Sequence, residues 1–174
     1  VMIKGMLKVG NPHPSLRELI LNGVTRANPQ QEAEFNKKHP YYGEVIGNTA
    51  YINEQKLREG GSTGNFEGDM FFGEALHRLN ETSPYWHNRL KESANKDKEV
   101  QKWKKDSYEY AKLTGETREI DDWWNTSRLD QVIGGYLLGG ENANVHTMRN
   151  WSKDLPFGTI FRNELEEFKQ ALDR

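Results

Sequence analysis

The chain has 174 residues, a formal net charge of −2 and a pI near 6.3, so it lacks the positive excess typical of proteins with broad affinity for nucleic acid. The absence of cysteine excludes disulfides, thiol nucleophiles and cysteine-bound zinc. No apolar run approaches the roughly 20 residues of a membrane span and no signal peptide is recognisable, so we expect a soluble protein with one domain over residues 1–174.

The N-terminal part is predicted to form short helices and a hairpin. An edge strand is expected at residues 6–9, and a first helix follows Pro14 and stops at Asn22-Gly23. A second helix is capped by Asn28 and ends before Pro40. A small β-hairpin is expected near residues 44–53, because two short apolar runs flank Gly47-Asn48, a pair that suits a two-residue turn.

A glycine-rich segment, residues 60–68, leads into a helix predicted from Asp69 to Glu81. The helix places apolar residues on one side, and on the other side it places three polar residues: Glu74, His77 and Glu81. The glycine segment has no phosphate-loop pattern. It is a candidate lid beside the polar face, with an ordinary surface loop as the alternative.

The C-terminal half is helical in pattern. Ser83-Pro84 opens one helix, and a charged helix rich in Lys and Glu follows and closes at Thr114-Gly115. Ser127 to Asp130 is similar to a capping box, and the strongest apolar periodicity of the chain follows it. A short helix is expected around residues 145–151, and the last helix carries four apolar residues on one face: Phe161, Leu165, Phe168 and Leu172. The sequence therefore predicts a mainly α fold (an α-rich α+β fold), a helical single domain with one small β-hairpin.

Glu74-x-x-His77 is the first candidate catalytic pair. Residues three apart share a helix face, so the carboxylate can orient the imidazole or act beside it as an acid or base. Metal sites on helices usually need two such motifs and the chain has one, so no metal and no cofactor is predicted. The alternative is an exposed polar face with a modest contact between the two side chains.

Glu44 is a rival acid. It follows a helical segment and begins the predicted hairpin, a layout like that of the catalytic acid in lysozyme-like folds, and Tyr41 and Tyr42 beside it could raise its pKa. The alternative is a strand residue that faces solvent.

Candidate substrate-binding residues lie on both sides of the central helix. Trp123 and Trp124 follow two aspartates and could stack on sugar rings or bases, or else fill the core ahead of the helix. Asp69 closes the glycine-rich segment, and Asn144 and His146 belong to a polar cluster after the helix that could line the same cleft.

Two segments carry a resemblance to a known family. Gly64-Asn65-Phe66 with Gly73 and Leu76, and later Asp130-Gln131 with Ile133-Gly134, resemble the C-terminal toxin domains of bacterial polymorphic toxins, type 44. The resemblance covers about thirty residues. It implies a small effector that hydrolyses a bacterial macromolecule. The tryptophan-bearing segment and the acidic Gly-Asp-Asp element of that family are not matched, so no catalytic residue is carried over.

The expected function is hydrolysis of a bacterial polymer by an effector or toxin, with a peptidoglycan-type glycan preferred over RNA because carboxylates and aromatics are plentiful and a basic excess is absent. Glu74 would be the general acid or base and His77 its partner. One alternative is a non-catalytic binding or adaptor module of a phage or secretion system. Another is a metal-dependent hydrolase, which needs a third ligand.

Partners follow from these alternatives. The expected partners are a polymeric substrate or a protein, with a cognate immunity protein as a further candidate. No membrane partner is expected and nucleic acid is the less favoured substrate. Secretion, or delivery to another cell, would use a signal outside this chain.

Overall fold

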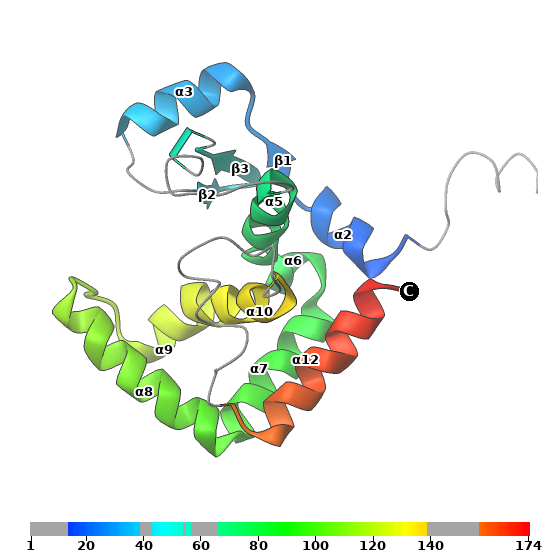
Figure 1. Cartoon of the computed structure of the whole chain (residues 1–174), viewed down its shortest axis with the longest axis vertical. Helices are drawn as coiled ribbons and strands as arrows, with labels where there is room; N and C mark the ends of the chain where they lie inside the picture. The colour runs from blue at the N-terminus through cyan, green and yellow to red at the C-terminus, as the bar shows by residue number, and fades with distance from the viewer. Residues whose placement is uncertain (1–13, 39–42, 54, 57–65, 139–156) are drawn as a thin grey trace, which may run out of the picture.

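The computed structural model describes residues 14–38, 43–53, 55–56, 66–138 and 157–174, without the side chains of residues 66–70 and 138. The fold is mainly α with a small β-sheet, which confirms the predicted class (Figure 1). Predictions for residues 6–9, 60–65 and 145–151 lie outside the described residues.

The N-terminal part contains two helices and the sheet: α2 (Leu16–Asn22), β1 (Thr25–Arg26), α3 (Pro29–Lys38), β2 (Gly43–Ile46) and β3 (Thr49–Ile52). The hairpin of β2 and β3 is confirmed, and Gly47 at its turn has a φ of 63°, a conformation that favours glycine. The sequence did not reveal β1, which has two residues and pairs in parallel with β3.

The sheet lies between two helices (Figure 1). Its strand order is β1-β3-β2, so β2 is an edge strand. Ala50 and Ile52 are fully buried, on the face that packs against α5 (Phe66–Leu76). Tyr51 points to the opposite face, where its ring stacks on Phe35 of α3 with centroids 4.7 Å apart. The candidate site lies at the outer edge of β2, beside the face of the sheet that α5 covers.

The rest of the chain is a set of packed helices. α7 and α12 lie side by side, α8 extends from the end of α7, and α10 packs against α5 (Figure 1). The bounds are α6 Leu79–Thr82, α7 Pro84–Lys96, α8 Lys98–Leu113, α9 Ile120–Trp123, η1 Trp124–Arg128, α10 Leu129–Leu138 and α12 Thr159–Leu172. The apolar face predicted for the last helix is confirmed, since all four of its residues are buried.

The helix expected from Asp69 to Glu81 is interrupted. It begins at Phe66 and ends at Leu76, and two residues separate it from α6, which starts at Leu79. The backbone N–H of His77 donates to the carbonyl of Glu74 at 3.1 Å, a three-residue bond that tightens the last turn and ends α5. The prediction that Glu81 shares a face with Glu74 was therefore wrong; Glu81 is exposed and pairs with Arg78.

The capping box predicted at Ser127 was also wrong. The helix starts at Ile120 and continues without a break into α10 through one π-helical turn, η1. Trp123 and Trp124 within it are buried, at 6% and 0% exposure, so packing of the two indoles holds this region in the helix. Asp130 does not cap the helix; it lies buried within it, ten residues after its start at Ile120.

A buried carboxylate, Asp97, joins three helices where α7 ends. As the N-cap of α8 it accepts hydrogen bonds from the backbone N–H groups of Glu99 and Val100, each at 3.1 Å. It also accepts from the N–H groups of Gly158 and Phe161 at the start of α12, each at 3.1 Å. A side chain at Gly158 would meet this carboxylate, because its Cβ would lie 2.6 Å from Asp97 Oδ1. One acid therefore caps two helices that are distant in sequence.

No helix in the described ranges has both the length and the apolar character that crossing a bilayer requires.

We predict that Asp97→Ala lowers the free energy of unfolding by roughly 2–4 kcal/mol, because it removes the caps of two helices and leaves buried N–H groups without acceptors. Burial alone would raise the pKa of Asp97, but the backbone N–H groups of Phe161, Val100 and Gly158, with a hydrogen bond from the Glu99 side chain, outweigh burial and lower it. The difference in the free energy of unfolding between the wild type and Asp97→Ala should thus persist at pH 4 and decrease only as the pH falls below the usual aspartate range. Urea denaturation at each pH measures this difference. Asp106→Ala on the exposed face of α8 is the matched control and should change little. An equal, small effect of both variants would contradict the double-cap role.

Candidate active site

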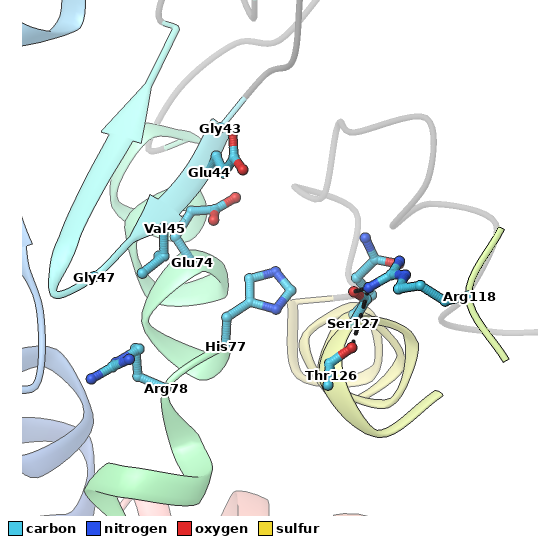
Figure 2. A pocket seen from close by; sticks show the side chains of 11 residues that line it. Gly43, Glu44, Val45, Gly47, Glu74, His77, Arg78, Arg118, Thr126 and Ser127 are labelled. Atoms are coloured by element: carbon cyan, nitrogen blue, oxygen red, sulfur yellow. Dashed lines mark hydrogen bonds between the residues drawn. The ribbon is translucent and has the colours of Figure 1, made fainter. Parts of the chain in front are cut away.

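A cavity of about 520 Å³ opens along the free edge of β2, between the end of α5 and the π-helical turn. Figure 2 shows Glu44 and Glu74 near each other on one side, with the His77 ring extending from α5 toward the helix that carries Thr126 and Ser127. Its lining residues come from four places in the sequence: Gly43, Glu44, Val45, Gly47, Glu74, His77, Arg78, Arg118, Thr126, Ser127 and Gln131. The cavity thus unites the two acids and the histidine that the sequence singled out.

Glu74 is a buried acid on the last turns of α5. Only 8% of the residue is exposed, so the alternative of an exposed polar face was wrong for this residue. Burial raises the pKa of Glu74 to about 7, Glu44 adds to the rise, and His77 opposes it. Gly43 lets the strand approach this closely, since a Cβ there would lie 2.9 Å from Glu74 Oε1. The environment therefore keeps a carboxylic acid partly protonated near neutral pH.

Glu44 reaches the same cavity from the edge strand. It is half-buried, which does not fit the alternative of a strand residue that simply faces solvent. In the pleated sheet, Gly43 and Val45 point toward α5, whereas Glu44 alternates to the α3 face. Because β2 is the edge strand, a side chain from either face can lie at its border. Glu44 and Glu74 thus approach the cavity from opposite faces of the sheet.

His77 forms an ion pair with Asp130 of α10. The distance from His77 Nδ1 to Asp130 Oδ2 is 3.7 Å, and the side chains are 26% and 5% exposed. Burial alone would lower the pKa of His77, but the Asp130 and Glu74 carboxylates outweigh it and raise the pKa. Burial raises the pKa of Asp130, and His77 opposes that rise. Asp130 therefore fixes one ring nitrogen and leaves Nε2 as the nitrogen available for proton transfer.

Two irregularities of the backbone bring these groups together. His77 lies at the break that ends α5, and Asp130 lies just after the π-helical turn that starts α10. π-Helical turns occur often at functional sites, because the extra residue redirects the side chains that follow. Sequence analysis missed Asp130 as a site residue; the available signal was an acid between the buried Leu129 and Val132, where a charge needs a partner.

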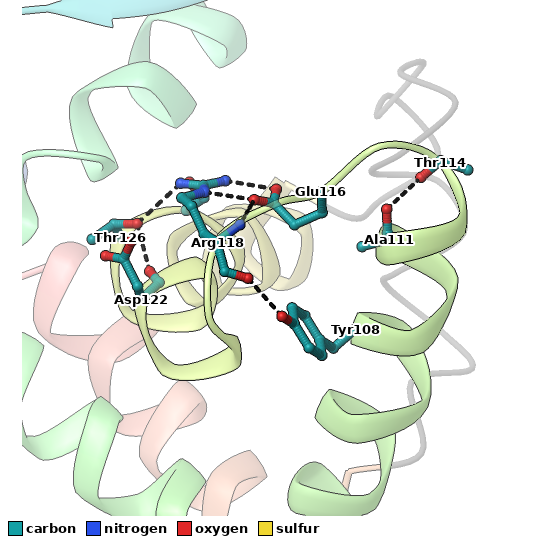
Figure 3. Close-up of polar contacts among 8 residues, drawn as sticks. Tyr108, Ala111, Thr114, Glu116, Arg118, Asp122 and Thr126 are labelled. Carbon is teal, nitrogen blue, oxygen red and sulfur yellow. Dashed lines mark hydrogen bonds and ion pairs between the residues drawn. The ribbon is translucent and has the colours of Figure 1, made fainter.

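Two arginines line the cavity, but both already have acidic partners. Arg118 donates from Nε to Glu116 Oε1 at 2.8 Å and from Nη2 to Glu116 Oε2 at 2.9 Å (Figure 3). Its Nη1 donates to the hydroxyls of Thr126 and Ser127. The arginine hydrogen bond lowers the pKa of Glu116 to about 2. Arg78 bonds Asn48 and Glu81, and in Figure 2 it points away from Glu74 and His77.

The tryptophan pair lies in the core. Trp124 packs edge-on against Trp103 with centroids 6.1 Å apart, and Trp123 lies 5.4 Å from Tyr108. Their burial supports the structural alternative over stacking on a substrate. The side chain of Asp69, and the whole of Asn144 and His146, lie outside the described residues.

No group of three or more His, Asp or Glu side chains that could hold a metal ion is found within the described part of the chain. Comparison with protein-family models, curated proteins and solved structures finds no match to the chain. The resemblance to toxin domains stays a prediction.

We predict that Glu74→Gln stabilises the fold at alkaline pH. A carboxyl with a raised folded-state pKa contributes stability that is full below pH 4.5 and is lost as the pH rises through about 7. The glutamine variant avoids this loss, so its advantage over the wild type should grow from near zero at pH 4 to as much as about 3 kcal/mol at pH 8 in urea titrations. Glu92→Gln on exposed α7 is the control and should show no such trend. A pH-independent difference for Glu74→Gln would contradict the raised pKa.

We also predict that Asp130→Asn lowers the pKa of His77, because the carboxylate that favours the imidazolium is removed. Titration of the imidazole protons by NMR measures this directly. Asp122→Asn, an exposed position in α9, serves as the control and should leave His77 unchanged. An unaltered His77 titration in the Asp130 variant would mean that the ion pair has no electrostatic effect.

Proposed function

We propose that the protein is a hydrolase that uses general acid–base catalysis on a bacterial polymer, with a peptidoglycan-type glycan as its substrate. The observation that carries this proposal is the buried Glu74, whose pKa is raised to about 7 and which opens into a cavity beside a second carboxylate, Glu44. Two carboxyl groups in different environments, one partly protonated and one more accessible, are the arrangement that glycoside hydrolysis requires.

In this mechanism Glu74 donates its proton to the leaving glycosidic oxygen as the bond to the anomeric carbon breaks. Glu44, as the general base, takes a proton from a water molecule whose oxygen forms the new bond to that carbon, so that a C–OH group replaces the glycosidic bond. His77, held by Asp130, lies next to Glu74 and can return a proton to it for the next cycle.

The charge of the cavity favours a glycan. A phosphate backbone is bound by cations that are available to it. Of the two arginines that line the cavity, Arg118 forms two hydrogen bonds with the Glu116 carboxylate, and Arg78 forms an ion pair with Glu81. Hydroxyl and amide groups such as Thr126, Ser127 and Gln131 complete the lining, and these suit neutral sugar hydroxyls.

RNA is the second candidate, because the pair of Glu74 and His77 can also serve as base and acid in phosphodiester cleavage, and the raised pKa of His77 favours its acidic form. The adaptor-module alternative is less well supported, since a binding surface has no need of a buried acid with a raised pKa facing a cavity. An effector role, with delivery to another cell and a cognate immunity protein, rests on the resemblance to toxin domains.

The test is lysis of purified cell wall. Wild-type protein should solubilise the wall, and Glu74→Gln should reduce the rate by roughly 10²–10⁴-fold, because the proton donor is lost. Glu44→Gln should also impair lysis, whereas Glu92→Gln on α7 should match the wild type. Circular dichroism checks that each variant is folded. Undiminished lysis by Glu74→Gln would refute its role, and cleavage of RNA without lysis of the wall would transfer the proposal to the second candidate.

A further inference from the structure

A second cavity lies on the other side of the edge strand. It has a volume of about 350 Å³ and lies between α3 and the hairpin. Four of its lining residues belong to α3 and two belong to the sheet: Gln31, Glu34, Phe35 and Lys38, and Ile46 and Tyr51. None of these residues belongs to the candidate active site.

The register of the hairpin connects the two cavities. Glu44 of β2 pairs directly with Tyr51 of β3, so the two side chains stand opposite each other on the α3 face of the sheet. Ile46, two residues along β2, lies on that same face and is 49% exposed. Glu44 lines the first cavity while Tyr51 and Ile46 line the second. A chain bound at Glu44 can therefore continue around the short edge strand toward Tyr51.

The chemistry of the second cavity matches a sugar unit. The Tyr51 ring is half-buried and held by its stack on Phe35, with an angle of 21° between the rings, so it offers a rigid apolar surface together with Ile46. The C–H face of a pyranose packs on such a surface. Around it stand a carboxylate, an ammonium and an amide from Glu34, Lys38 and Gln31, which can bond ring hydroxyls or N-acetyl groups.

Polymer hydrolases use binding energy from units remote from the cleaved bond to hold the reacting unit in place. We propose that the cavity between α3 and the hairpin is a subsite for a further saccharide residue of the glycan cleaved at Glu74 and Glu44. This subsite rests on the proposed function, and it assigns to Tyr51, Ile46 and Lys38 the binding of a unit that does not react.

The test measures binding and uses Glu74→Gln as background, so that the ligand is not cleaved. The probes are the β-1,4-linked dimer and tetramer of N-acetylglucosamine, titrated by NMR or calorimetry. The tetramer should bind more tightly than the dimer. Tyr51→Ala should weaken tetramer binding by about tenfold and leave dimer binding unchanged, because only the longer probe reaches the second cavity.

Two neighbouring lysines provide a matched pair. Lys37 and Lys38 are both exposed in the last turn of α3, but only Lys38 lines the cavity. Lys38→Ala should weaken tetramer binding about threefold, and Lys37→Ala should have no effect. This pair keeps the test decisive even where Tyr51→Ala disturbs packing against Phe35, and Tyr51→Phe should retain the stacking surface and most of the affinity.

Equal effects of Lys37→Ala and Lys38→Ala, or loss of dimer and tetramer affinity together, would overturn the subsite. So would equal affinity of the parent for the two probes, or no binding of either. The proposed function is judged separately, by whether wild-type protein lyses cell wall and Glu74→Gln does not. A protein that lyses the wall and shows no length dependence would retain the proposed function and lose the subsite.

Discussion

One imidazole stands between two buried carboxylates, and the chemistry of the site depends on that charge balance. Glu74 and Asp130 are both buried, and His77 faces each of them and opposes the rise in pKa that burial causes. Burying an isolated carboxylate costs free energy because its charge loses contact with water, so burial favours the protonated carboxylic acid. His77 opposes the rise in pKa at both carboxyl groups, but burial outweighs it and raises the pKa of Glu74 to about 7. The pKa of Glu74 is therefore raised because His77 offsets the effect of burial only in part.

The backbone creates this balance through close approach. Gly43 has no side chain, so the edge strand comes within contact of the Glu74 carboxylate and excludes water from it. The break after α5 places His77 beside α10. Asp130, which follows the π-helical turn, forms an ion pair with it there. Each device is local, yet the three come from segments of the chain that fold into different elements. A substitution that displaced any of these three backbone features would let water reach Glu74 and Asp130, and their pKa values would then return toward those of exposed carboxyl groups.

Regular features could be read from the sequence and irregular ones could not. The hairpin around Gly47, the cap at Asn28 and the apolar face of α12 follow directly from turn chemistry and periodicity, and the structure confirms them. The break at His77 and the π-helical turn are set by packing between distant segments, which a local pattern does not record. For the same reason Glu74 and Glu44 could be nominated from the sequence, whereas their meeting at a strand edge, and the partner Asp130, required the tertiary structure.

The hydrogen bonds of Asp97 can be completed only after the C-terminal helix α12 has been synthesised. The chain emerges from its N-terminus, so Glu44, Glu74 and Asp130 are all made before α12. Until α12 is made, the carboxylate of Asp97 lacks half of its donors, and α7 lacks the helix that covers it. The residues of the candidate site are then already present, while the face of α7 that α12 covers is still open to water. Such an architecture places the completion of the helical core, and of the second cap at Asp97, after every described residue of the candidate site has been translated.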